Sequence, residues 1–279
     1  MISVLAPAKV NLYLHVGPPN ASGRHPLDSL TVFAGPEAAD RLTVEPAESV
    51  QLAVIGSNAS DCGPMVDNLV FRAADALKKT LGTPEGARIT LVKHLPVAAG
   101  IGGGSADAGA ALRALNALWK GPQELDHLIA IGAHLGGDVP ACIVSKPLLM
   151  RGEGERLSGW PLPAGIPALL ANSGVPCPTG PIFQAFDAAG GGTDFKEQTP
   201  PRLTTLTALL EWLPTTYNDL ESAALTRHPD LAKTLKKLQV LPNARCVRMS
   251  GSGGTCFALF ETMDQARTAG EMLRALPPA

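Results

Sequence analysis

Apolar and polar side chains alternate along several short stretches of the chain. Every second position from Val10 to Val16 is apolar, which is the period at which side chains of a strand reach the same face. This pattern predicts a half-buried strand over 10–16, followed by a turn over 18–25. The same criteria predict further strands at 29–33, 41–44, 51–55, 88–93, 246–249 and 255–260.

Apolar residues spaced three and four positions apart predict helices elsewhere. The clearest helix covers 68–81, where Gly82 and Pro84 follow the last apolar position and end it. The other expected helices lie at 107–118, 123–135, 203–213, 220–238 and 263–276.

The stretch from 146 to 202 is rich in proline and glycine. It predicts a domain junction near Met150 and a flexible connection at 188–200. We therefore expect an α+β fold in two parts, an N-terminal domain at 1–150 and a C-terminal domain at 151–279.

The composition is that of a globular protein. Of the 279 residues, 45% are hydrophobic and 17% charged, and the net charge of −2 with scattered Lys and Arg gives no nucleic-acid surface. No apolar stretch could span a membrane, and no basic region precedes the apolar N-terminal residues, so no signal peptide is expected. The five cysteines contain no C-x-x-C pair, which indicates reduced thiols in the cytoplasm rather than a zinc site or a disulfide framework.

The most informative segment is 95–108, where four glycines and Ser105 separate an apolar segment from an alanine-rich helix. Glycine lets the backbone approach a bulky ligand and adopt positive φ without steric cost. The helix that follows presents unpaired N–H groups and the positive end of its dipole, which together bind anions. The segment therefore predicts a phosphate-binding loop, with a bare strand-to-helix turn as the alternative.

Two well-known nucleotide-binding loops do not fit this segment. No Gly-Lys-Ser/Thr follows the glycines, so it is not a Walker loop. In the dinucleotide pattern a third glycine should stand where this chain has Ser105, and no suitably placed acidic residue follows. The loop thus indicates a nucleotide-using enzyme of another kind.

Three further segments carry candidate chemistry, each with an alternative. Lys9 and Asn11 point to the same side of a predicted strand, either as a binding pair or as its solvated start. Asp138 follows a predicted helix end among small apolar residues, where it could be a general base beside a cation or a turn former. At 249–257 glycine and hydroxyl residues alternate between two predicted strands, which favours a tight hairpin over a second backbone cradle.

In order and content, these segments resemble the motifs of the GHMP kinases, the superfamily of galactokinase and the homoserine, mevalonate and phosphomevalonate kinases. The matching runs are Pro-Ala-Lys-x-Asn-Leu-x-Leu at 7–14, Pro-x-x-Ala-Gly-Ile-Gly-Gly-Gly-Ser-Ala-Asp-Ala at 96–108, Gly-Gly-Asp-Val-Pro at 136–140 and Ser-Gly-Ser-Gly at 250–253. Shorter matches at 67–69, 179–183 and 218–221 extend the resemblance from residue 2 to about 260. Within the superfamily the chain is most similar to the kinases that act on a cytidine-diphosphate-linked methylerythritol in the non-mevalonate isoprenoid pathway.

The resemblance implies a two-domain kinase with its active site in the cleft between the domains. Such an enzyme transfers the γ-phosphoryl group of ATP to the 2-hydroxyl of that substrate. Asp138 would accept the hydroxyl proton, while Lys9 keeps the aspartate ionised and stabilises the transferring group. Phosphoryl transfer depends on positioning and charge stabilisation, which this pair can supply. The implied cofactors are ATP and Mg²⁺, with Ser105 near the phosphate-bound Mg²⁺.

The resemblance also implies binding residues. Asn68 and Lys93 lie where the family contacts the nucleotide. The loop residues that would wrap the phosphates are Pro96, Ala98, Ala99, Gly100, Ile101, Gly102, Gly103, Gly104, Ser105 and Ala106. The residues that would hold the substrate are Asn11, Arg24, His25, Asp138, Thr179 and Phe183, with His25 at the cytosine edge and Phe183 against the base.

Two positions depart from the family pattern. Members commonly have Gly-Tyr-His, with the tyrosine stacked on cytosine, where this chain has Gly23-Arg24-His25. A guanidinium group stacks with a different geometry and adds a charge. Ala106 stands where many members have a second serine, so one hydroxyl donor is missing.

Two other functions stay open at this point. The first is phosphorylation of mevalonate, phosphomevalonate or homoserine, against which the matches around His25 and Thr179 argue. The second is a non-catalytic ligand sensor on the same fold, against which the retention of both Lys9 and Asp138 argues. The expected partners are a small-molecule substrate and ATP, with neither nucleic acid nor membrane, for a cytoplasmic monomer or homodimer.

Overall fold

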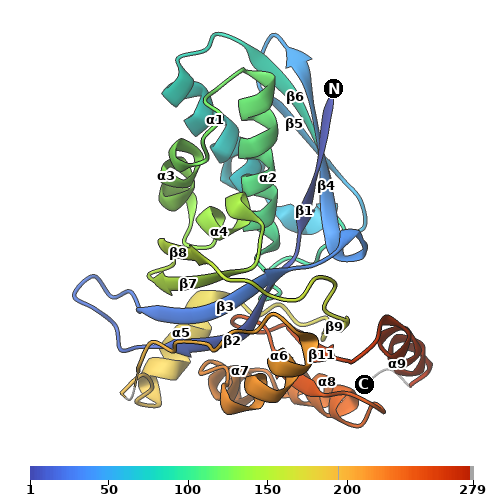
Figure 1. The fold of residues 1–279 in the computed structure, drawn as a ribbon. Coiled ribbons are helices and arrows are strands. Elements are labelled where there is room, and N and C mark those ends of the chain that lie inside the picture. Colours follow the sequence, from blue (N-terminus) through green and yellow to red (C-terminus); the bar gives the residue numbers. More distant parts are fainter. Residues whose placement is uncertain (194, 277–279) are drawn as a thin grey trace. The chain divides into compact units, whose positions relative to one another are not determined.

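The computed structural model describes residues 1–193 and 195–276, and Figure 1 shows their ribbon. The chain divides into two compact units that alternate along the sequence. Unit 1 comprises Met1–Lys9, Val32–Val97 and Gly102–Lys146, and unit 2 comprises Val10–Thr31, Ala98–Ile101 and Pro147–Ala279. The glycine-rich segment therefore has residues in both units, and the exact domain boundary near Met150 stays a prediction.

Unit 1 is built on a four-stranded sheet in the order β1-β4-β6-β5. Its strands are β1 (Ile2–Pro7), β4 (Ala39–Ala47), β5 (Gln51–Ile55) and β6 (Gly86–Val92). The pair β5–β6 is parallel, which requires a crossover, and helix α1 (Leu69–Leu81) provides it. The unit also contains α2 (Gly103–Leu118), α3 (Asp126–Leu135), the short α4 (Val139–Val144) and 3₁₀ turns at Pro36–Ala38, Ala59–Cys62 and Met65–Asp67.

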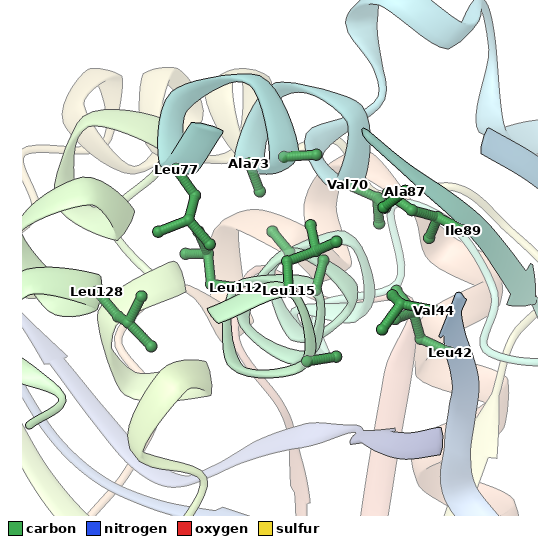
Figure 2. Close-up of a cluster of buried hydrophobic side chains, with 14 of the residues drawn as sticks. Leu42, Val44, Val70, Ala73, Leu77, Ala87, Ile89, Leu112, Leu115 and Leu128 are labelled. Carbon is green, nitrogen blue, oxygen red and sulfur yellow. The ribbon is translucent and has the colours of Figure 1, made fainter. Parts of the chain in front are cut away.

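The core of unit 1 fills the space between this sheet and its helices. Figure 2 shows Leu112 and Leu115 of α2 among Leu77 of α1 and apolar side chains of β4 and β6. Asn68 begins α1 by accepting the Val70 N–H at 2.9 Å, and a left-handed residue, Gly82, ends it. Because α2 is held along its length by this core, its N-terminus has a fixed position in the unit.

Unit 2 contains two sheets and a set of helices. One sheet has the order β2-β3-β7-β8, formed by β2 (Lys9–Val16), β3 (Leu27–Phe33), β7 (Leu148–Gly152) and β8 (Arg156–Gly159). The other has the order β10-β11-β9, formed by β9 (Ala168–Asn172), β10 (Cys246–Met249) and β11 (Thr255–Leu259). The helices are α5 (Thr179–Ala188), α6 (Leu206–Trp212), α7 (Glu221–Arg227), α8 (Pro229–Gln239) and α9 (Met263–Ala275), with a 3₁₀ turn at Leu213–Thr215. Among the described residues, no helix is long and apolar enough to cross a bilayer.

The structure corrects several expected elements. The helix expected at 220–238 is two helices, because Pro229 lacks an N–H and holds the preceding His228 outside the helical region at φ −130° and ψ 81°. Helix α2 begins four residues earlier than expected, since Gly103 and Gly104 form its first turn. Strands β1, β7, β8 and β9 and helix α5 were not predicted. In the expected connection at 188–200, Gln198 donates its N–H to Asp28 at 2.6 Å, and Asp194 lies outside the described residues.

Candidate active site

Lys9 and Asp138 form a close ion pair within unit 1. Lys9 is the first residue of β2 and Asp138 directly precedes α4, and Lys9 Nζ lies 2.6 Å from Asp138 Oδ1. The lysine side chain is 4% exposed, whereas the aspartate side chain is 38% exposed. Asp138 makes no side-chain capping bond to α4, so the ammonium group sets the direction of its carboxylate. The pair therefore presents an oriented Asp138 carboxylate that is accessible from solvent.

The N-terminus of α2 lies against this pair. Gly102 precedes the helix with φ +60°, and a Cβ at this residue would be 3.3 Å from two carbons of Lys9 and 3.7 Å from Asp138 Oδ2. Ala106 N–H makes the first intrahelical bond, to Gly102 O at 2.7 Å. The N–H groups of the helix's first residues therefore have no partner within the helix, and Gly102 has no side chain to cap them. Unpaired N–H groups at a helix start bind phosphate oxygens.

The remaining loop residues, 98–101, are held within unit 2 by the glycine turn that joins β10 and β11. A Cβ on Gly100 would lie 2.4 Å from the carbonyl oxygens of Ser250 and Gly253, so only glycine fits at this φ of +69°. Ser250 Oγ donates to Gly100 O at 3.1 Å, and Cys177 N–H donates to Ala98 O at 2.8 Å. The expected hairpin is thus confirmed, and its turn packs backbone to backbone against the first glycine loop.

Asn11 is also held by this turn, and its orientation is fixed. Asn11 N–H donates to Ser250 Oγ at 3.2 Å, and its side-chain amide donates to Ser29 Oγ at 2.8 Å and Thr31 Oγ1 at 3.3 Å. Because the Ser29 hydroxyl gives its proton to Tyr13 O at 2.6 Å, it must accept from Asn11. The Asn11 Oδ1 is therefore left buried without a hydrogen-bond partner among the described residues.

The predicted substrate residues of unit 2 fall into three places. Thr179, at the start of α5, has its hydroxyl 3.1 Å from Ser252 Oγ in the glycine turn. His25 and Phe183 lie together, with ring centroids 4.8 Å apart, and His25 Nδ1 donates to Gly17 O at 2.8 Å. Arg24 points elsewhere: its side chain is 73% exposed and pairs with Glu153 at 3.0 Å.

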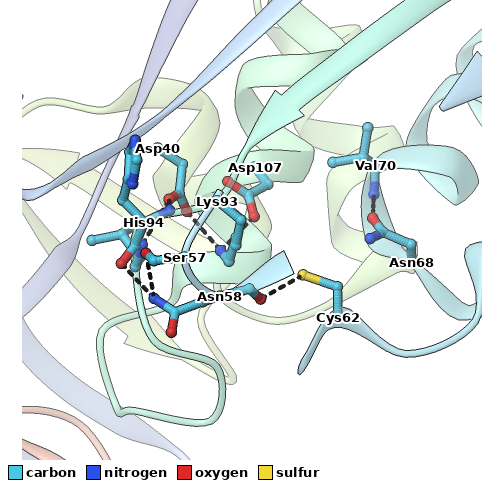
Figure 3. A network of polar contacts seen from close by, with 10 residues as sticks. Asp40, Ser57, Asn58, Cys62, Asn68, Val70, Lys93, His94 and Asp107 are labelled. Carbon is cyan, nitrogen blue, oxygen red and sulfur yellow. Dashed lines mark hydrogen bonds and ion pairs between the residues drawn. The ribbon is translucent and has the colours of Figure 1, made fainter. Parts of the chain in front are cut away.

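Behind the glycine loop in unit 1 lies a buried cluster of three charges (Figure 3). Lys93 Nζ lies 2.6 Å from Asp40 Oδ2 and 2.7 Å from Asp107 Oδ2, and all three side chains are at most 4% exposed. The other oxygen of Asp40 accepts the N–H groups of His94 and Leu95, at 2.5 and 2.8 Å. The cluster joins the strand end before the loop to the second turn of α2.

Electrostatics keeps this cluster together. Burial lowers the pKa of Lys93, but the charges and hydrogen bonds of Asp107 and Asp40 outweigh it, so its pKa is raised. Burial raises the pKa of Asp107 to about 7, against the opposing effect of Lys93. A Cβ on Gly103 would lie 3.2 Å from Lys93 Nζ, so the ammonium group packs closely against the backbone of the first residue of α2.

Three predicted nucleotide residues have structural partners here. Lys93 is committed to two carboxylates, and the Asn68 oxygen caps α1. The Ala106 methyl group is buried in a small cluster with Ala6, Ala110 and Cys142. The contacts of these residues with a nucleotide stay predictions, and so do those of the rest of the loop: Pro96, Ala98, Ala99, Gly100, Ile101, Gly102, Gly103, Gly104 and Ser105.

Sequence reasoning missed several residues that shape this site. Asp40 stands in an ordinary strand and gives no signal in the sequence, and Ser29 likewise carries no local pattern. Asp107 lies inside the glycine motif, but the motif does not indicate that its carboxylate pairs with Lys93.

An uncapped helix start beside an oriented Lys–Asp pair is the arrangement expected of a small-molecule kinase, and the relatives reported below belong to that class. Two family models match the chain: "GHMP kinases N terminal domain" over residues 68–146 and "GHMP kinases C terminal" over residues 201–279. The chain belongs to the GHMP kinase family.

Individual relatives give a finer comparison. The chain is 53% identical over 269 residues to a 4-diphosphocytidyl-2-C-methyl-D-erythritol kinase of Hyphomonas neptunium, covering 96% of this chain and 90% of the relative. It is 44% identical to the kinase of the same name from a Jannaschia species, covering 95% and 90%. A crystal structure of 4-(cytidine 5'-diphospho)-2C-methyl-D-erythritol kinase matches with a TM-score of 0.79 and 36% identity, covering 98% of this chain and 96% of that one. The Methanococcus jannaschii mevalonate kinase shares the fold, with a TM-score of 0.66 at 10% identity, covering 98% and 94%.

Proposed function

We propose that this protein phosphorylates the 2-hydroxyl group of 4-diphosphocytidyl-2-C-methyl-D-erythritol with ATP, a step of isoprenoid precursor biosynthesis. The observation that carries the proposal is the Lys9–Asp138 pair at 2.6 Å, with Gly102 at the start of α2 against it. The names of the relatives, at up to 53% identity over nearly the whole chain, support the choice of substrate.

In this mechanism Asp138 accepts the proton of the attacking hydroxyl group. Lys9 orients the carboxylate in the ground state, and its positive charge offsets the charge that develops on the transferring phosphoryl group. Because Lys9 is almost fully buried, its charge is poorly screened by solvent and acts strongly at this position. Positioning by the surrounding backbone supplies the remainder, since little covalent chemistry is needed.

The residues of the glycine loop fit a nucleoside triphosphate and Mg²⁺. The uncapped N–H groups at the start of α2 suit phosphate oxygens, and the absence of side chains at Gly102 and Gly103 allows close approach. Among the described residues no cluster of three His, Cys, Asp or Glu could hold a metal by itself. This suits Mg²⁺, which takes few protein ligands beside phosphate oxygens and water, and Ser105 would supply a hydroxyl. The bound ion would neutralise phosphate charge in the transition state.

The substrate residues would act as follows. The unpartnered Asn11 Oδ1 would accept a hydrogen bond from the substrate, and Thr179 would donate or accept through its hydroxyl. His25 and Phe183 would receive the cytosine ring, whose flat face suits the adjacent aromatic side chains. Arg24 would contact the same part of the substrate after leaving Glu153.

The test is an ATP-consumption assay of the purified protein with Mg²⁺, offering the cytidine compound, mevalonate and homoserine in parallel. Turnover with the cytidine compound alone is the expected result. Turnover with another alcohol would discard the proposed cytosine site while keeping the role of the Lys9–Asp138 pair. Binding of ATP without any turnover would favour a ligand sensor instead.

A further inference from the structure

One face of α2 runs from the phosphate loop to the segment that carries Asp138. Gly102, Ala106, Gly109, Ala110 and Arg113 are spaced by four, three, one and three residues, so they lie along one side of the helix. All but the last are glycine or alanine. This stripe lets another backbone come close, and it ends in a long charged side chain.

Helix α4 packs directly on this stripe. A Cβ on Gly109 would lie 2.8 Å from the carbonyl carbon of Cys142 and 2.9 Å from Ile143 N, so the two backbones are in contact there. Ala106 and Ala110 pack with Cys142 and with Ala6 of β1. The segment after Asp138 therefore has little room to shift on α2.

Arg113 closes the far end of the same contact. Its Nη1 donates to Cys142 O at 2.6 Å and to Ile143 O at 3.1 Å, and its Nη2 donates to Leu5 O at 3.2 Å. The last carbonyl groups of a helix have no partner within it, so the guanidinium group satisfies two of those of α4. Leu5 lies in β1, four residues before Lys9. One side chain of α2 is thus bonded to α4, which directly follows Asp138, and to β1, which ends two residues before Lys9.

Placing the charged guanidinium group of Arg113 here costs desolvation energy. Burial lowers the pKa of its guanidinium group, and the partners named above are carbonyl oxygens rather than carboxylates. A half-buried cation without an ionised partner is a costly way to hold a helix end, and an apolar side chain of similar length would fill the space. The forked guanidinium group reaches three carbonyl oxygens at once, and an apolar residue could not form these bonds.

We propose that Arg113 is a positioning residue for phosphoryl transfer, which fixes the distance and direction between Asp138 and Lys9 by tying α4 and β1 to α2. This inference rests on the proposed function, in which Asp138 accepts the substrate proton. Arg113 donates its hydrogen bonds to backbone carbonyl groups of α4 and β1, so it acts through the segments that adjoin Asp138 and Lys9 in sequence.

The experiment compares Arg113→Met and Arg113→Lys in the full-length protein, each in the wild-type and the Asp138→Asn background. Arg113→Met should lower kcat about 10- to 100-fold with little change in the KM for ATP, because a small displacement of the base slows the chemical step. Arg113→Lys, which keeps the charge but not the fork, should recover part of kcat. In the Asp138→Asn background, Arg113→Met should cause almost no further loss of kcat. Hydrogen exchange should rise in the peptide covering 139–144.

A purely structural role for Arg113 predicts different results. The control Leu77→Ala opens a cavity in the core of the same unit and should lower stability while leaving kcat per folded molecule unchanged. The proposal is overturned if Arg113→Met behaves like this control, or if it lowers kcat by the same factor in both backgrounds. A wild-type kcat in Asp138→Asn alone would instead refute the proposed role of Asp138, so the two failures can be told apart.

Discussion

Asp138 Oδ1 accepts a 2.6 Å hydrogen bond from Lys9 Nζ, and the two partners differ sharply in exposure. The ammonium group is buried, whereas more than a third of the aspartate side chain faces solvent. The surrounding protein fixes the ammonium group, and the ammonium group in turn fixes the carboxylate through Oδ1. The other carboxylate oxygen, Oδ2, is then available to a substrate. This is the arrangement expected of a positioned base rather than of a salt bridge that serves stability alone.

Replacing Asp138 should remove activity but not the fold. Asp138→Ala should lower kcat by at least about 10²-fold, because the group proposed to accept the hydroxyl proton is lost. The protein should stay folded, since Asp138 is part-exposed and gives α4 no side-chain cap, but it should lose some stability because the buried Lys9 ammonium loses its partner. Steady-state kinetics and circular dichroism check the two parts. An active Asp138→Ala variant would contradict the mechanism.

Gly102→Ala should lower kcat as well as stability, because its added methyl group would contact Lys9 in addition to straining the backbone. At φ +60° an alanine costs about 1–2 kcal/mol, and its methyl group would press on the side chain of Lys9 at 3.3 Å. Gly82→Ala is a matched control, because Gly82 has φ +63° and nothing within 4 Å of a Cβ. Both variants should lose similar stability in urea denaturation. Only Gly102→Ala should lower kcat, and equal kcat values would contradict the close packing against Lys9.

Lys93→Met should destabilise unit 1 and weaken the binding of ATP. Removing the ammonium leaves Asp40 and Asp107 buried against each other, at a cost of about 3–5 kcal/mol. The KM for ATP should rise, because Asp40 also holds the backbone N–H groups that lead into the glycine loop.

The exposed pair Lys79–Asp75 serves as the control for this variant. Its side chains are 75% and 52% exposed, so Lys79→Met should cost less than about 0.5 kcal/mol and leave the KM unchanged. A Lys93→Met protein with wild-type stability would show that the buried cluster does not hold the loop.

Local patterns predicted the parts of the fold that depend on neighbours in sequence. The alternation before Val16 and the Gly82 stop placed β2 and the end of α1 correctly, because strand period and helix caps are local properties. The expectation of a half-buried strand was wrong, since every residue of β2 is buried and its polar face is covered by other parts of the fold. Strands β7, β8 and β9 were missed, since each is only four or five residues long and lies in a proline- and glycine-rich stretch. The partners of β7 and β9 are also distant in sequence, because β7 pairs with β3 and β9 pairs with β11.

The candidate site shows the same division. Lys9, Asp138 and Gly102 could be predicted together, because their motifs carry the chemistry in short runs, and the structure brings all three into contact. Lys93 was expected at the nucleotide, but its two carboxylate partners are 53 and 14 residues away and left no pattern near it. The alternation of the two units along the chain, set by long-range packing, also had no local signal.

Arg24 should affect substrate binding more than the chemical step. Arg24→Ala should raise the KM for the cytidine substrate about tenfold and change kcat less, because a charge-assisted contact contributes to binding in both ground and transition states. Glu153→Gln, which weakens the hold on Arg24, should leave that KM unchanged or lower it. Arg245→Ala, in another exposed pair, is the control for a lost surface charge. An unchanged KM in Arg24→Ala would remove this residue from the substrate site.

His15 should make the protein less stable in mild acid. Burial lowers the pKa of His15, with Arg248 acting in the same direction and the charges of Asp219 and Asp28 opposing it. The centroid of the imidazole ring lies 4.9 Å from that of the Tyr13 ring and 4.4 Å from that of the Tyr217 ring. The Nε2 atom of His15 is buried without a hydrogen-bond partner among the described residues. Because the folded state binds the proton less readily than the unfolded chain, stability is lost as pH falls from about 6.5 through the lowered pKa.

His15→Phe keeps a ring in this position and removes the titration. Urea denaturation at about pH 7.5 and about pH 5.5 should show a smaller loss of unfolding free energy for this variant than for the wild type. His94 is exposed, so His94→Gln should keep the wild-type difference between the two pH values. An equal pH dependence in His15→Phe and the wild type would assign the acid sensitivity to other groups and contradict the effect of burial on His15.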